Sequence, residues 1–96
     1  MKNLVSLTIG HNVGDVPTFT TEEVVAAATT LLGALGATVI SCRGMWQGMP
    51  EASTRIEVVT GLEADHIRAR VEKLSHYMMQ DCIMCEVKPT TIEFLG

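Results

Sequence analysis

The sequence predicts an α+β domain of the ferredoxin-like, or split βαβ, plan: a four-stranded antiparallel sheet with two helices on one face. Two observations carry this prediction. Four segments have the alternating or β-branched pattern of strands, and two segments between them repeat apolar residues at helical spacing. The resulting order is βαββαβ with a short C-terminal extension. No linker or change in composition divides the chain, so we expect residues 1–96 to form a single domain.

The first strand and the first helix are marked by two different apolar periods. Alternation over residues 4–9 predicts a strand, and Gly and Pro then break the pattern over residues 10–17. Thr20 and Glu23 have the spacing of a capping box, in which two side chains satisfy backbone N–H groups at the start of a helix. Apolar residues at helical spacing extend this helix over about residues 21–34.

After a helix stop at Gly36, two apolar and β-branched segments predict a hairpin. Its strands cover residues 37–43 and 54–59, and residues 44–53 form the turn between them. This turn holds the only tryptophan, Trp46, together with two glycines, a proline and a glutamate. Because polar and conformationally special residues are concentrated there, we expect the turn to contribute to a binding or reaction site.

Thr60 and Glu63 repeat the capping-box spacing and predict the start of a second helix. One face of this helix carries an apolar stripe formed by Ile67, Val71, Leu74 and Met78. Residues 82–87 predict the last strand, and Pro89 starts a tail. The apolar tail residues expected to pair at a sheet edge are Ile92, Phe94 and Leu95.

Composition and charge restrict the partners that we expect. The chain has 7 Lys and Arg against 11 Asp and Glu, a formal net charge of −4, and no basic run, so no nucleic-acid partner is expected. No apolar run approaches the roughly 20 residues that cross a bilayer, so no membrane partner is expected. Three cysteines and the lack of a recognisable secretory signal favour a cytoplasmic protein.

The face of the sheet without helices requires a polar surface or a cover. Its expected residues are half apolar: Leu4, Ser6, Thr8, Val39, Arg55 and Val59. Packing against further copies of the chain in a closed ring would cover them, so we expect a homo-oligomer.

The topology places the polar connections at one edge of the sheet. This edge collects the loop over residues 10–17, the turn over residues 46–51 and the junction at Gln80 and Asp81. The connections at the opposite edge are short and chemically plain. Since loops on a rigid scaffold commonly carry binding sites, this asymmetry predicts a site at the first edge.

Each candidate residue at this edge has a functional and a structural interpretation. Glu51 either directs its carboxylate at a cation or is a solvated turn residue. Trp46 either stacks on an adenine-like ring or anchors the hairpin or a subunit interface. His11 and Asn12, at the tip of a glycine-containing loop, bond either a ligand or their own backbone.

Two further patterns, an acidic residue at a helix end and a pair of cysteines, bear on the chemistry of this edge. Asp81 is unfavourable at the C-terminal end of a helix, so a specific hydrogen bond, local or to a ligand, would explain it and its neighbour Gln80. Cys82 and Cys85 have Cys-x-x-Cys spacing, but positions i and i+3 of a strand face opposite sides. We therefore expect no metal site, and the sequence has no nucleophile or dinucleotide motif.

The turn from residue 44 to residue 53, with a tryptophan followed by glycine and then by a glutamate and a serine entering a strand, resembles the hairpin of small trimeric proteins of the PII and CutA kind. This resemblance implies a homotrimer with ligand clefts between subunits. A narrower resemblance, covering most of the chain after residue 35, is to phage-encoded S-adenosylmethionine lyases. It rests on Glu51 shortly before a strand with Thr54, an amphipathic helix, and then residues 80–83 at nearly the family's spacing.

The lyase resemblance implies that Glu51 assists an intramolecular reaction, in which the carboxylate of S-adenosylmethionine displaces methylthioadenosine and forms homoserine lactone. It implies neither a metal nor a cofactor. Trp46 stands where the family has a tyrosine, and it would stack on or wall an adenosine-type ligand. The rim would be completed by His11, Asn12, Gln80 and Asp81. The alternative is a non-catalytic PII-like sensor or a phage protein that sequesters a nucleotide signal, and a third is a purely structural module.

Overall fold

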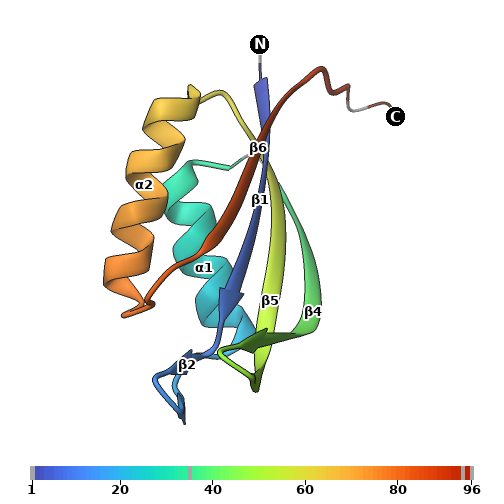
Figure 1. Cartoon of the computed structure of the whole chain (residues 1–96). Helices are drawn as coiled ribbons and strands as arrows, with labels where there is room; N and C mark the ends of the chain where they lie inside the picture. Colours follow the sequence, from blue (N-terminus) through green and yellow to red (C-terminus); the bar gives the residue numbers. More distant parts are fainter. Residues whose placement is uncertain (1, 35, 94, 96) are drawn as a thin grey trace.

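A computed structural model describes residues 2–34, 36–93 and 95, except for the side chain of Trp46. The main strands are β1 (Lys2–Gly10), β4 (Ala37–Trp46), β5 (Met49–Thr60) and β6 (Met84–Thr90), and the helices are α1 (Thr21–Leu32) and α2 (Ala64–Tyr77). The four strands form an antiparallel sheet in the order β4-β5-β1-β6. Both helices cover the same face of this sheet (Figure 1). The predicted ferredoxin-like arrangement is confirmed.

The core lies between the helices and one face of the central strands. The register sets Val5 opposite Val58 and Leu7 opposite Ile56, and all four are buried. The predicted apolar stripe packs on this layer and is buried as expected: Ile67, Val71 and Leu74 lie in α2, and Met78 is its C-cap.

The register also corrects the composition of the helix-free face. Val39 pairs with the core residue Ile56 and therefore lies on the helix side, contrary to the prediction. Its neighbour Ile40 pairs with Arg55 on the helix-free face. Successive residues of a strand point to opposite faces, so an error of one residue in the strand register exchanges the two faces.

The capping box of α1 is present as predicted, but the helix ends earlier. The Glu23 backbone N–H donates to the Thr20 hydroxyl over 3.2 Å, and the Thr20 N–H donates to the Glu23 carboxylate over 3.1 Å. The helix stops at Leu32 because Gly33, with φ of 58°, adopts the left-handed conformation that favours glycine. Gly36 is therefore not the stop.

The second predicted capping box is wrong. Glu63 is the N-cap of α2, and its side chain makes no capping hydrogen bond. Thr60, the last residue of β5, instead donates its hydroxyl to the Leu32 carbonyl over 3.1 Å and accepts from the Leu62 N–H over 3.2 Å. The hydroxyl therefore joins the end of α1 to the end of β5.

The hairpin strands extend much further than predicted. β4 and β5 pair up to Trp46 and Met49, so the turn consists of Gln47 and Gly48 alone, with φ of 50° and 80°. Two consecutive positive φ values are the signature of a type I′ turn, which matches the twist of the flanking strands. Glu51 and the residues after it consequently lie in β5 rather than in a turn.

Three smaller differences concern the loop and the tail. The loop after β1 contains a two-stranded ribbon, β2 (Asn12–Val13) and β3 (Val16–Pro17), that was not predicted. β6 begins two residues late and includes Pro89, which an edge strand tolerates because one of its sides needs no ladder hydrogen bonds. Ile92 and Leu95 lie outside the strands, and Phe94 lies outside the described residues.

Neither helix among the described residues has the length and apolar composition needed to cross a membrane.

Replacing Thr60 by valine is expected to lower the free energy of unfolding by about 1–3 kcal/mol, because the buried Leu32 carbonyl and the partly buried Leu62 N–H lose their partner. Urea denaturation measures this loss. Thr60→Ser, which keeps the hydroxyl, is the control for the two hydrogen bonds. A valine variant within about 0.5 kcal/mol of the wild type would contradict the bridging role of the hydroxyl.

Candidate ligand-binding site

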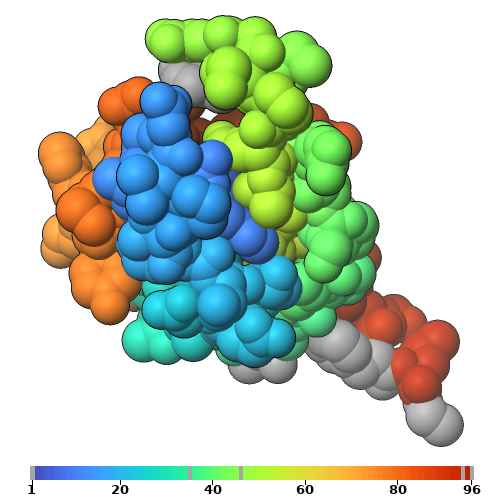
Figure 2. Space-filling model, turned by 90° about the horizontal axis from the view of Figure 1, so that it is seen from below, coloured from blue at the N-terminus to red at the C-terminus, as the bar shows by residue number. Residues whose placement is uncertain are grey.

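Three connections that are far apart in the sequence meet at one end of the sheet. They are the β2–β3 ribbon, the β4–β5 turn and the segment between α2 and β6 (Figure 1). Seen from this end, the ribbon lies between the end of α2 and the projecting β4–β5 hairpin (Figure 2). An open cavity of about 540 Å³ is lined by all three, a size suited to a small molecule. The cavity lies at the sheet edge that the sequence indicated.

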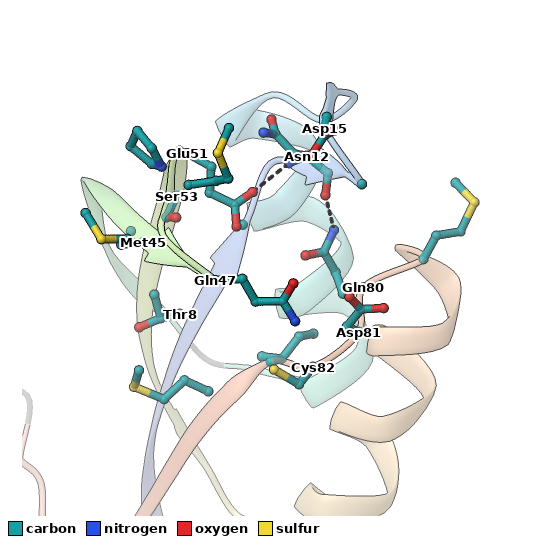
Figure 3. A pocket seen from close by; sticks show the side chains of 18 residues that line it. Thr8, Asn12, Asp15, Met45, Gln47, Glu51, Ser53, Gln80, Asp81 and Cys82 are labelled. Carbon is teal, nitrogen blue, oxygen red and sulfur yellow. Dashed lines mark hydrogen bonds between the residues drawn. The ribbon is translucent and has the colours of Figure 1, made fainter.

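The backbone of Asn12 links the two walls of this cavity. Its N–H donates to Oε2 of Glu51 over 3.2 Å, and its carbonyl accepts from Nε2 of Gln80 over 2.9 Å (Figure 3). Nε2 of Gln80 also donates to the Met78 carbonyl over 3.3 Å. The ribbon is thereby fixed to β5 on one side and to the end of α2 on the other.

The position of the Glu51 carboxylate requires a glycine at residue 10. A Cβ atom placed on Gly10 would come within 2.6 Å of Cδ of Glu51, well inside van der Waals contact. The missing side chain therefore lets the carboxylate lie against β1, within reach of the Asn12 N–H. Glu51 is half-buried in this position.

His11 faces a different partner. Its Nε2 lies 2.6 Å from the hydroxyl of the buried Thr54, and its backbone N–H donates to the Ala52 carbonyl over 3.0 Å. His11 is not among the described residues that line the cavity. The structure thus gives His11 a contact that fixes the loop to β5, and its contact with a ligand stays a prediction.

Two residues of the cavity wall are held in a backbone conformation that favours glycine. Gln47 and Met79, with φ of 50° and 54°, are the non-glycine residues with positive φ among those described, and both line the cavity. Met79 occupies the left-handed position that ends α2, where the Gln80 N–H donates to the Ser75 carbonyl over 2.9 Å. A left-handed non-glycine residue costs roughly 1 kcal/mol, and such strain concentrates at functional sites.

The cavity is acidic and rich in sulfur. Its ionisable carboxylates come from three separate segments: Asp15, Glu51 and Asp81. Lys, Arg and His are absent from its described lining. Thioether side chains form much of the rim, namely Met45, Met49, Met79 and Met84.

The side chain of Ser53, 4% exposed, also lines the cavity.

The cysteines are not arranged as a metal or dithiol site. Cys82 lines the cavity, whereas Cys85 pairs with the core residue Leu7 on the helix side of the sheet. Burial raises the pKa of the Cys85 thiol, and the charge of Arg68 only partly opposes this, so the thiol stays protonated at neutral pH. Within the described part of the chain, no cluster of His, Cys, Asp and Glu side chains is placed to hold a metal ion.

The cavity brings together most of the residues that the sequence singled out. Glu51, Asn12, Gln80 and Asp81 line it, His11 does not, and the side chain of Trp46 lies outside the described part. Sequence reasoning missed several lining residues: Asp15, Gln47, Ser53 and Met79. The Gln47-Gly48 pair at the centre of an alternating hairpin was an available signal for the turn. Met79 carried none, since glycine is the usual residue at its position.

Replacing Met79 by glycine is expected to raise the free energy of unfolding by roughly 1 kcal/mol, because the left-handed backbone no longer carries a Cβ. Met79→Ala removes the same side chain but keeps the Cβ, so it is expected to give no gain. Thermal unfolding of the two variants measures the difference. Equal stability of the glycine and alanine variants would show that this position is not strained.

No protein-family model matches the chain, and no curated protein sequence matches it. Solved structures do match. A phage SAM lyase in complex with S-methyl-5′-thioadenosine is 25% identical, with a TM-score of 0.74 over 91% of this chain and 80% of that chain. The divalent cation tolerance protein CutA1 from Thermus thermophilus is 16% identical, with a TM-score of 0.61 over 98% and 88% of the two chains.

A PII-like signaling protein, also from Thermus thermophilus, is 19% identical, with a TM-score of 0.53 over 91% of this chain and 83% of that chain. The CutA1 and PII-like structures, at these identities, show the fold. Together the comparisons confirm the predicted resemblance: the chain is a ferredoxin-like protein, structurally similar to phage S-adenosylmethionine lyases and to CutA- and PII-like proteins.

Proposed function

We propose that this chain binds an adenosine-type small molecule in the cavity and cleaves S-adenosylmethionine to methylthioadenosine and homoserine lactone. The observation that carries the proposal is the similarity to a phage SAM lyase in complex with S-methyl-5′-thioadenosine, at 25% identity and a TM-score of 0.74. The cavity adds support, because its carboxylates and thioethers suit a cationic ligand with an apolar body.

The proposed reaction is intramolecular and needs no external nucleophile. One oxygen of the substrate's carboxylate attacks the γ-carbon of the methionine moiety, and the bond between that carbon and the sulfonium sulfur breaks. The electron pair of this bond stays on sulfur, which becomes a neutral thioether, and no proton is gained or lost. The protein's task is to hold the substrate folded, since a well-oriented intramolecular attack is the source of the rate.

The substrate has two cationic groups, the sulfonium and the α-ammonium, and the change in charge during the reaction indicates which of them Glu51 binds. The sulfonium charge disappears during the reaction, so a carboxylate beside it would stabilise the substrate more than the transition state. The α-ammonium keeps its charge throughout. We therefore assign the Glu51 carboxylate, held by the Asn12 N–H, to the ammonium.

The other two carboxylates of the cavity favour the folded conformation of the substrate in which it reacts. Asp15 and Asp81 repel the substrate's carboxylate from the cavity wall, and that carboxylate approaches its own sulfonium instead. Trp46, Asn12 and Gln80 form the proposed wall and rim around the adenosine, and His11 completes the loop behind them. No metal or cofactor takes part in the proposed reaction.

The proposed assembly is a homotrimer in the cytoplasm, with the site at the subunit boundary. Large apolar side chains at the rim support association: Met45 is 73% exposed and Met84 is 67% exposed. The odd number of cysteines favours a reducing compartment.

A non-catalytic binder is the second candidate. The similarity to a PII-like signaling protein and the presence of Trp46 where the lyase family has a tyrosine favour it. Such a protein would bind an adenosine ligand and release it unchanged on denaturation.

Purified protein incubated with S-adenosylmethionine is expected to release methylthioadenosine and homoserine lactone, detected by liquid chromatography with mass detection. Glu51→Gln keeps the shape of the side chain but removes its charge, and should lower kcat/KM at least about tenfold, equivalent to ~1.4 kcal/mol. Unchanged turnover in this variant would remove Glu51 from the mechanism. Binding of methylthioadenosine without any turnover would favour the non-catalytic binder.

Gly10→Ala tests the position of the carboxylate without changing its charge. The new methyl group occupies the space of the Glu51 carboxylate, which is the mobile end of its side chain, so the variant should fold while turnover falls as in Glu51→Gln. Gly61→Ala is the matched control, because a Cβ there meets no atom within 4 Å. Full activity of Gly10→Ala would show that the observed carboxylate position is not the productive one.

A further inference from the structure

The charge distribution of the cavity indicates which adenosyl compounds it accepts. We infer that the site selects phosphate-free, cationic adenosyl compounds, an inference that rests on the proposed function. An adenosylsulfonium that lacks the α-carboxylate binds more tightly than neutral methylthioadenosine and is not cleaved. Such a compound is a dead-end ligand of the proposed lyase.

The negative charges of the cavity come from three separate segments of the chain. Asp15 comes from the ribbon, Glu51 from β5 and Asp81 from the segment after α2 (Figure 3). The ion pair found among the described residues, Lys88 with Glu86 at 3.6 Å, involves none of them. With no cationic side chain in the described lining, the three carboxylates keep their attraction for a cation in the cavity.

A neutral side chain of the cavity wall favours the same ligand chemistry. The Gln80 side chain donates twice through Nε2, to the Asn12 and Met78 carbonyls, and its Oε1 can only accept. This oxygen and the three carboxylates accept hydrogen bonds and donate none, which suits ammonium and amino groups and does not suit a phosphate.

The same charges separate ligands that share an adenosyl group. A nucleotide brings a phosphate into an acidic cavity and finds no Lys or Arg in the described lining. Decarboxylated S-adenosylmethionine keeps the sulfonium and the terminal ammonium but lacks the carboxylate that the cavity repels. It also lacks the nucleophile of the proposed reaction, so no lactone forms and the bond between carbon and sulfur stays intact.

Isothermal titration calorimetry on the wild-type protein tests this selection with three ligands: decarboxylated S-adenosylmethionine, methylthioadenosine and adenosine monophosphate. Decarboxylated S-adenosylmethionine, which carries two positive charges, is expected to bind most tightly. Neutral methylthioadenosine follows, and adenosine monophosphate binds most weakly. We expect the double cation to bind at least about fivefold more tightly than methylthioadenosine, with a ratio that falls as salt is added. Chromatography after incubation should recover it intact.

Matched variants test whether the acidic residues of the cavity cause the ratio of the two affinities. Asp15→Asn and Asp81→Asn should each lower it, whereas Glu72→Gln, on the exposed face of α2 and away from the cavity, should not. Equal affinity for decarboxylated S-adenosylmethionine and methylthioadenosine would overturn the inference, as would tighter binding of adenosine monophosphate. In either case, turnover of S-adenosylmethionine would still support the proposed function. If neither methylthioadenosine nor S-adenosylmethionine binds, the proposed function and this inference both fail.

Discussion

The candidate site depends on the two hydrogen bonds that hold the backbone of Asn12. Its N–H binds the Glu51 carboxylate and its carbonyl binds the Gln80 amide, so a short loop joins the central sheet to the end of α2. A charged acceptor makes the first bond one of the stronger kind. The His11 N–H also holds the loop to β5 through the Ala52 carbonyl, and the bond from Gln80 to the Asn12 carbonyl joins the ribbon to the end of α2.

Local backbone geometry supports this link at several points. Gly10 leaves room for the carboxylate, and the left-handed residues Gln47 and Met79 direct the chain around the opening. The rest of the sheet follows ordinary packing, with a core between the central strands and the two helices. Departures from the most stable local choice are therefore concentrated where the cavity lies, as expected for a chain selected for a site as well as for stability.

The fold was predictable from the sequence because apolar periodicity reports burial directly. The stripe from Ile67 to Met78 identified α2 and its buried face, and the order of elements then determined the sheet. Local signals were less reliable where tertiary contacts compete with them. Thr60 has the spacing of a capping residue, yet its hydroxyl bonds the Leu32 carbonyl, a contact 28 residues away in sequence. The edge that carries the cavity was predictable from topology, but the contact between Gly10 and Glu51 depends on strand register.

The central claim is that one cavity, built around Asn12, is the ligand site. An NMR titration of ¹⁵N-labelled protein with methylthioadenosine tests it most directly, because the backbone amide of Asn12 and the side-chain amide of Gln80 report on the two hydrogen bonds. If the cavity is the ligand site, these two signals shift, together with the amides of Gln47 and Met79. A second groove, of about 530 Å³, lies between α1 and α2, and Leu31 and Tyr77 are among its lining residues. Shifts confined to that groove would contradict the claim.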